Sequence, residues 1–268
     1  MTHAKHWCSL LVVCSFVPSY LWYLARITSG GESAWAMALI PYLLYCGMKG
    51  EKPVNQAAAT NKRNKKNLLT SLGILVYSLT WWFPCAALIK ATIAILTLLN
   101  HFGKIQQWRF TLLSLLTLPW MASMQFFLGY PLRRLVTEAS ALGLRLGGLP
   151  IEAQGTGLSL HEQAVYVDPP CSGIKMLWAG IIVMALLTHL LRLSAKATGL
   201  LLLATVTTLI TANVIRGSIL FFPESHLVQW PDWTHEGVGL VVYTLSILLL
   251  TQLAQYLRKR LPTPYVHT

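Results

Sequence analysis

The feature that most constrains this chain is a series of about eight long apolar stretches separated by short polar segments. The hydrocarbon core of a bilayer is about 30 Å thick, so a helix that crosses it needs roughly 17–25 mostly apolar residues. The stretches that meet or approach this length are residues 7–25, 33–48, 67–83, 86–100, 109–128, 173–191, 198–214 and 237–257. Apolar residues make up 54% of the chain and charged residues 11%, a balance that soluble domains do not tolerate. The sequence therefore predicts an all-α polytopic membrane protein with about eight transmembrane helices.

The basic residues predict which side of the membrane each loop faces. Lys and Arg gather in four parts of the chain, residues 49–66, 104–109, 192–196 and 258–260. The positive-inside rule assigns such clusters to the cytoplasm, and eight crossings with both termini inside satisfy all four. The same topology places every acidic residue except Glu51 outside. Because the positive charges follow the loops and form no groove-sized patch, no nucleic-acid partner is expected.

Four arginines depart from this rule, because the topology places them outside. They are Arg26, Arg133, Arg134 and Arg145. At the outer surface these side chains could bind lipid phosphates or substrate. Membrane lipid is therefore an expected partner, and Arg133 is a candidate substrate-binding residue.

The first apolar stretch is expected to remain in the protein as a helix. Its short basic flank is similar to that of a signal peptide, and Leu-Val-Val-Cys ending at Cys14 faintly matches a lipoprotein site. The residue before Cys14 is Val13, however, where such cleavage prefers a small residue, and a long hydrophobic chain follows. We therefore expect neither kind of cleavage.

The segment of residues 129–172 is expected to lie outside the membrane with a structure of its own. Its first part has apolar residues at helical spacing, namely Leu132, Leu135, Val136, Ala139 and Leu142. This pattern is typical of a helix that lies in the membrane interface. Alternation at residues 158–160 and 165–167, with Gly155-Thr-Gly157 as the turn, predicts a small strand pair.

These elements divide one integral membrane domain, residues 1–268, into three parts. Helices one to five occupy residues 1–128, the extracytoplasmic segment residues 129–172, and helices six to eight residues 173–268.

Three residues lie at the ends of three different apolar stretches on the predicted outer side. Cys171 precedes the sixth stretch, Arg216 follows the seventh and His235 precedes the eighth. Pro169 and Pro170 forbid helix before Cys171, so its thiol is expected on the first turn of the sixth helix, where unpaired N–H groups favour a thiolate. A thiol, a guanidinium and an imidazole at one membrane depth indicate a site of acyl transfer. Taken singly, these residues also fit the roles of apolar filler, headgroup anchor and interfacial-belt residue.

Several neighbours could support or compete with this trio. Ser172 and Asn213 are expected to support it. Lys175, one turn below the thiol, could lower the thiol pKa or extend to the headgroups, and it is a second candidate substrate-binding residue. His161 and His226 are also predicted outside and remain rival bases.

Two further polar side chains lie within predicted spans. His189 is near the inner end of the sixth helix and is expected to be structural. Lys90 lies inside the fourth helix, and an intramembrane charge needs a partner or a water-filled cavity.

The cysteines leave one redox alternative open. Cys8, Cys14 and Cys46 lie in or at the end of the first two predicted helices, and no Cys-x-x-Cys spacing indicates a metal site. Cys85 and Cys171 are both predicted outside, so a disulfide between them is the alternative to a free thiol in an oxidising compartment.

At the trio the chain resembles the exosortase/archaeosortase family of multi-spanning transpeptidases. The resemblance is carried by Cys-Ser-Gly at 171–173, Asn-x-x-Arg at 213–216, His235 followed by Gly237, and Tyr-Pro-Leu-Arg at 130–133. It implies that Cys171, Arg216 and His235 are the catalytic residues, supported by Ser172, Gly173 and Asn213. Two positions depart from the family pattern. Pro170 stands where a small or acidic residue is usual, and Gly217 stands where Ile is usual.

The resemblance also implies an activity and its partners. The protein would be a membrane-embedded cysteine protease or transpeptidase, in the cytoplasmic membrane of a bacterium or archaeon, with its site on the extracytoplasmic side. Its substrates would be exported proteins with a C-terminal tripartite sorting signal: a Pro-Glu-Pro-like motif, a transmembrane helix and a basic tail. The acyl group would pass through a Cys171 thioester to an acceptor of unknown identity. Neither a metal nor an organic cofactor is implied.

Two other functions fit parts of the sequence. A membrane thiol-disulfide oxidoreductase would use Cys85 with Cys171 as its reactive pair. A non-enzymatic export or assembly subunit would line a path with Arg216 and Lys90 and would not need Cys171.

Overall fold

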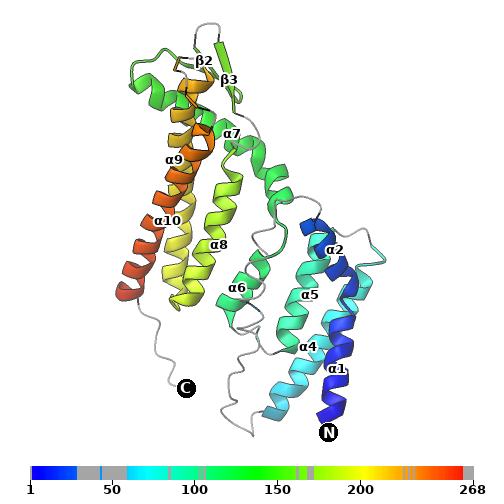
Figure 1. Ribbon diagram of the computed structural model, residues 1–268. Coiled ribbons are helices and arrows are strands. Elements are labelled where there is room, and N and C mark those ends of the chain that lie inside the picture. The colour runs from blue at the N-terminus through cyan, green and yellow to red at the C-terminus, as the bar shows by residue number, and fades with distance from the viewer. Residues whose placement is uncertain are drawn as a thin grey trace. The chain divides into compact units, whose positions relative to one another are not determined.

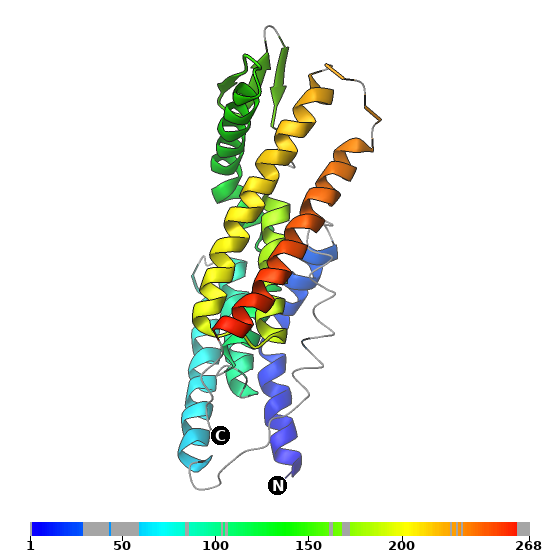
Figure 2. The same cartoon turned by 90° about the vertical axis from the view of Figure 1, so that its left-hand side faces the viewer.

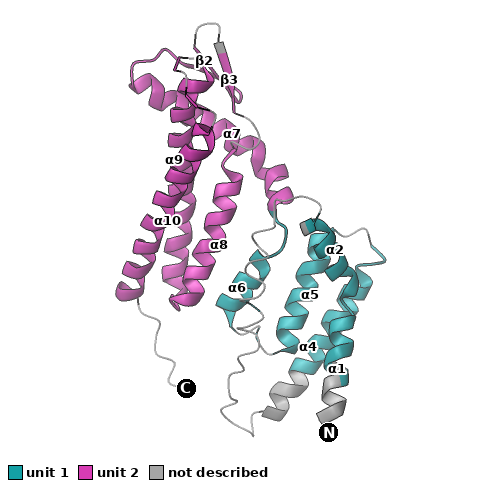
Figure 3. Cartoon of the chain, in the orientation of Figure 1, with its two compact units in different colours: residues 1–120, 266–268 teal, residues 121–265 magenta. Residues whose placement is uncertain are grey.

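The computed structural model describes residues 2–28, 43, 59–83, 86–102, 104, 107–160, 163–167, 172–225, 227–228, 230–231 and 233–261, which are mostly helical (Figure 1). The chain divides into two compact units (Figure 3). Unit 1 comprises residues 1–120 and 266–268, and unit 2 comprises residues 121–265. The expected span 33–48 lies outside the described residues except for Leu43.

In the part of unit 1 that the structure describes, α5 contacts each of the other helices. These helices are α1 (Thr2–Cys14), α2 (Val17–Thr28), α4 (Ala59–Leu79), α5 (Ala87–His101) and α6 (Trp108–Leu116). Phe16, Tyr77 and Ala94 form a buried cluster, in which the rings of Phe16 and Tyr77 meet edge to face. The Tyr77 hydroxyl also shares a 2.8 Å hydrogen bond with the hydroxyl of Ser19, which satisfies both polar groups inside the apolar packing.

The expected spans of unit 1 meet with mixed outcomes. The stretch 86–100 is helical as expected, since α5 matches it within one residue, although α5 is shorter than a candidate membrane span. The stretch 67–83 is helical, but α4 begins earlier because the polar residues that open it are good helix formers. The prediction of one continuous helix over 7–25 is wrong, because the helix breaks at Ser15-Phe16. Pro18, which has no N–H to continue the ladder from the first helix, is the second residue of α2.

Unit 2 is arranged around one long helix. Its elements are α7 (Met121–Leu146), β1 (Glu152–Gln154), β2 (Gly157–Leu160), β3 (Gln163–Tyr166), α8 (Ile174–Leu190), α9 (Ala195–Glu224) and α10 (Thr234–Arg260). α9 packs against α7, α8 and α10, and Figure 2 shows α9 and α10 side by side along most of their length. α9 is therefore the helix that the other three helices of unit 2 share as a neighbour.

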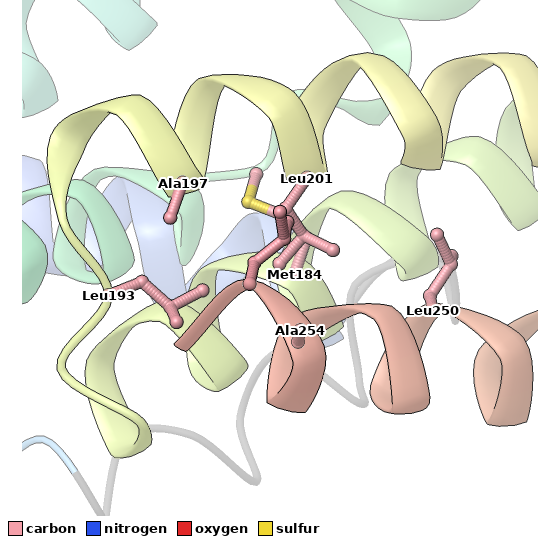
Figure 4. Packing of buried hydrophobic residues seen from close by; sticks show 7 residues of the cluster. Met184, Leu193, Ala197, Leu201, Leu250 and Ala254 are labelled. Atoms are coloured by element: carbon pink, nitrogen blue, oxygen red, sulfur yellow. The ribbon is translucent and has the colours of Figure 1, made fainter. Parts of the chain in front are cut away.

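A compact apolar cluster joins the three long helices at the end where α8 stops, α9 starts and α10 stops. Figure 4 shows Met184, Leu193, Ala197, Leu201, Leu250 and Ala254 pointing toward one another there. All of them are at most 3% exposed, so this end of the bundle is fixed by close packing. Two small alanines let the helices approach each other.

The opposite end of unit 2 carries a three-stranded antiparallel sheet of order β1-β2-β3. The predicted strand pair is confirmed by β2 and β3, in which Leu158 pairs with Val165. β1 was not predicted, and the turn at Gly155 joins it to β2. Leu158 and Ile151 are buried with Phe221, so the sheet packs on the last turns of α9.

The fifth expected helix does not end at residue 128. The stretch 109–128 is divided, because α6 ends at Leu116 and α7 begins at Met121. Pro119 lies in the break and disfavours helical geometry in the residue before it. α7 then runs through Pro131 and joins the second half of the expected span to the predicted interfacial helix.

The other predicted helices of unit 2 are present. α8 and α10 confirm the stretches 173–191 and 237–257 within three residues at each end. α9 begins near the expected residue but continues ten residues beyond 214. By length and composition, α9 and α10 can each cross a membrane, and α6 with α7 could form a third, broken span. Among the described helices, α5 and α8 are apolar but shorter.

Candidate active site

The candidate site lies at the sheet end of unit 2, where α9 ends and α10 begins. The prediction that Arg216 closes its helix is wrong, because α9 continues to Glu224. Helical rise places Arg216 about 32 Å along α9 from Ala195, close to the thickness of a bilayer core of about 30 Å. The last turns continue because Leu220 and Phe221 are buried, at 4% and 1% exposure.

Arg216 and His235 are in contact, as their sequence positions predict. The Arg216 Nη2 lies 3.4 Å from the His235 Nδ1. His235 is in the first turn of α10, so this contact joins the outgoing helix to the returning one. A guanidinium only donates hydrogen bonds, so the Nδ1 atom of His235 is the acceptor.

Glu224 is a third charged residue of the site and was not predicted as one. Its Oε1 lies 3.6 Å from the Nε2 of His235, on the side of the ring opposite to Arg216. The two side chains are 38% and 43% exposed respectively, so the pair opens toward solvent. The sequence signal that could have identified Glu224 is its spacing from Arg216. The two residues are eight positions apart, so they lie on one face of a continuous helix.

Gly239 gives Arg216 the space that it occupies. A Cβ atom on Gly239 would lie 3.1 Å from the Nε of Arg216, closer than most real contacts. That Nε is buried, and it has no hydrogen-bond partner in the part of the chain that the structure describes. The site therefore holds a guanidinium with a donor not yet used by the described residues.

The Cys-Ser-Gly and Asn-x-x-Arg motifs are adjacent. Gly173 caps the N-terminus of α8 with a left-handed φ of 79°, and a Cβ on it would lie 2.6 Å from the Asn213 Cγ. Ser172 is 2% exposed, and its hydroxyl accepts a 3.4 Å hydrogen bond from the N–H of Ile174. Cys171 lies outside the described residues, and α8 begins three residues after it rather than at it.

A cavity of about 90 Å³ separates the charged residues from the sheet. Its polar wall consists of Asn213, Arg216, Glu224 and His235. Val165 and Tyr166 of β3 line the opposite side. The cavity therefore brings four polar side chains together beside apolar walls.

Gly217, one departure from the family pattern, has a structural reason. Its position lies against α7, where a Cβ would be 3.3 Å from the Ser140 Oγ and 3.5 Å from the Val136 Cγ1. The Ser140 hydroxyl donates a 3.2 Å hydrogen bond to the Val214 carbonyl. α7 and α9 therefore approach too closely here for a large side chain at 217.

The remaining candidates have varied positions. Lys175 is exposed in the first turn of α8, and the Arg133 Nε donates a 3.4 Å hydrogen bond to the Gly129 carbonyl. His189 lies in the last turn of α8, at the other end of unit 2. In unit 1 the Lys90 ammonium lies 4.2 Å from the centre of the Trp81 ring, which gives this charge a partner.

Besides Cys171, other predicted positions cannot be placed. Cys85, His161, Pro170 and His226 lie outside the described residues. Among the residues that are described, no group of three or more His, Cys, Asp and Glu side chains could hold a metal ion.

A family model for transmembrane exosortases (EpsH) matches residues 36–251, which include the whole of the site described above. The chain belongs to the transmembrane exosortase family. Membership implies that this exosortase is a membrane transpeptidase that processes proteins with C-terminal sorting signals. No curated protein and no solved structure matches the chain significantly.

Proposed function

We propose that this exosortase cleaves the C-terminal sorting signal of exported proteins with Cys171 as nucleophile and transfers the cleaved protein to an acceptor. The observation that carries the proposal is the 3.4 Å contact between Arg216 and His235. It brings together two of the three residues that the sequence selected, from different helices. The contact between Gly173 and Asn213 attaches the Cys-Ser-Gly motif to the helix that bears Arg216.

The residues have complementary roles in acyl transfer. The Cys171 thiolate attacks the peptide carbonyl and forms a thioester, and the His235 imidazolium protonates the leaving amine. The Arg216 guanidinium stabilises the tetrahedral oxyanion. Its buried Nε and its Nη2 are the donors available for that charge. An amine, a hydroxyl or water then resolves the thioester.

The remaining polar residues shape the site or bind the substrate. Ser172, Gly173 and Asn213 shape the backbone beside the thiol, and Arg133 and Lys175 contact the sorting signal or nearby headgroups. Lys175 supports this role by its exposure on the first turn of α8.

The orientation of the site belongs to the same proposal. Eight crossings with both termini in the cytoplasm place the sheet end of unit 2 outside. Topology reporters fused after residues 60, 104, 194 and 262 should then read cytoplasmic. Reporters near residues 155 and 228 should read extracytoplasmic, and an inside reading at 155 contradicts the orientation.

The chemistry is tested by trapping the thioester. The parent full chain is co-expressed with a reporter protein that ends in a Pro-Glu-Pro motif, an apolar helix and a basic tail. A covalent adduct that hydroxylamine cleaves should form on Cys171, because the thioester persists until an acceptor resolves it. Cys14 is exposed and serves as the matched control. The adduct should persist with Cys14→Ala and disappear with Cys171→Ala, and an adduct mapped to any other residue contradicts the proposal.

A further inference from the structure

We infer that Glu224 is a positioning residue for His235: its carboxylate holds a proton on Nε2, so that Nδ1 is the nitrogen that exchanges protons during the reaction. This inference rests on the proposed function and adds one residue to it. Glu224 touches neither the thiol nor the scissile bond in this account, and it acts through the imidazole.

The contact with Arg216 decides which nitrogen carries the proton. The Arg216 Nη2 lies 3.4 Å from Nδ1, and a guanidinium has donors but no acceptor. Nδ1 must therefore present its lone pair to Arg216. In the neutral ring the single proton then resides on Nε2.

Glu224 faces the nitrogen that carries this proton. Its Oε1 lies 3.6 Å from Nε2, longer than a hydrogen bond but within reach of a small rotation of either partly exposed side chain. Catalytic contacts are commonly long in a site without substrate and tighten when it binds. Arg216 thus donates a hydrogen bond to Nδ1 of His235, and Glu224 faces the Nε2 atom of the same ring.

The arrangement of Arg216, His235 and Glu224 accounts for each transfer of the Cys171 thiol proton. When substrate binds, Arg216 transfers its hydrogen bond from Nδ1 to the carbonyl oxygen, and the Cys171 S–H proton passes to Nδ1. The thiolate forms the C–S bond while the carbonyl electrons move to oxygen. Collapse of this intermediate breaks the C–N bond, and the Nδ1 proton passes to the leaving amine. Glu224 stabilises the imidazolium throughout because it faces the Nε2–H.

The kinetic test compares two carboxylates that flank His235. Glu224→Gln and Glu224→Ala should lower kcat for reporter cleavage at least about tenfold, with KM nearly unchanged, because an orienting carboxylate acts after binding. Glu224→Asp should retain more activity than either. Glu236 is exposed in the first turn of α10, one residue from His235, so Glu236→Gln is the matched loss of charge and should retain the parental rate.

A second readout does not depend on turnover. Nitrogen NMR of the full chain labelled at histidine should give the Nε2–H tautomer for His235 in the parent, identified by its loss in His235→Gln. Glu224→Ala should lower the fraction of the Nε2–H tautomer, because the 3.4 Å contact with Arg216 is then the one described contact that favours it. Parental kcat together with an unchanged tautomer in the Glu224 variants overturns the inference. If the parent leaves the reporter uncut, the proposed function fails, and the tautomer of Glu224→Ala alone decides the role of Glu224.

Discussion

Gly173 packs against Asn213 so closely that a side chain on the glycine would overlap the amide. The glycine also holds a left-handed φ of 79°. This contact joins the segment that follows Cys171 to the helix that carries Arg216. Glycine is therefore required at 173 both by backbone conformation and by space.

The first prediction follows from this contact. Gly173→Ala should reduce cleavage of a sorting-signal reporter at least about tenfold, because the left-handed backbone costs an alanine about 1–2 kcal/mol and its Cβ would displace Asn213. Gly199 in α9 has no atom within 4 Å of an added Cβ and is the matched control. Gly199→Ala should process normally and be slightly more stable. Equal processing by both variants would mean that the contact has no role in the site.

The second prediction concerns the shape of the guanidinium. Arg216→Lys should keep the fold but lose most turnover, because an ammonium replaces a planar fork that reaches His235 and an oxyanion together. Arg134→Lys is the control, since Arg134 is exposed and paired with Glu138 at 2.7 Å on α7. The measurement is the cleaved fraction of reporter at equal enzyme abundance. Near-normal cleavage with Arg216→Lys would reduce Arg216 to a membrane anchor.

The third prediction tests the space that Arg216 occupies. Gly239→Ala should impair cleavage without loss of protein, because its Cβ would meet the Arg216 Nε at 3.1 Å and shift the guanidinium from His235. Leu240→Ala on the same helix removes a side chain that is 68% exposed and should leave cleavage unchanged. A parental rate in Gly239→Ala would show that the position of Arg216 tolerates displacement.

The fourth prediction concerns Lys90 in α5 of unit 1. Trp81→Leu should lower the free energy of unfolding by about 0.5–1 kcal/mol, because it removes the aromatic face over which the Lys90 ammonium lies. Trp82 is 86% exposed, so Trp82→Leu is the control and should change stability less. Thermal unfolding of the purified protein in detergent measures both. A larger loss from Trp82→Leu would contradict this partner for Lys90.

Apolar length predicted most helices, but the ends of helices depend on contacts that hydropathy does not include. α8 and α10 have the expected bounds because each helix ends close to where its apolar stretch ends. α9 runs past Arg216 because Phe221 packs against α7 and the sheet and Leu220 is buried beside it. The presence of a proline did not predict where a helix ends either. Pro119 lies in a break, whereas Pro131 is inside α7.

Because the seventh helix was expected to end at residue 214, Glu224 was not predicted as a site residue. Once α9 is known to continue, Asn213, Arg216, Leu220 and Glu224 recur at intervals of three and four residues on one face. With the helix ending at 214, Glu224 was only an acidic residue of an outer loop. The contact between Arg216 and His235 could be expected from the sequence, because their predicted depth in the membrane did not require the exact helix end.

Cleavage by Cys171→Ala is the most direct test of the central claim that Cys171 is the nucleophile. A small apolar replacement should leave the protein inserted and abundant, while reporters with the C-terminal signal accumulate uncleaved in the membrane. Cys14→Ala, which removes an exposed thiol of unit 1, should process normally in the same membranes. Unimpaired processing by Cys171→Ala would contradict the assignment of Cys171, Arg216 and His235 as a transpeptidase site.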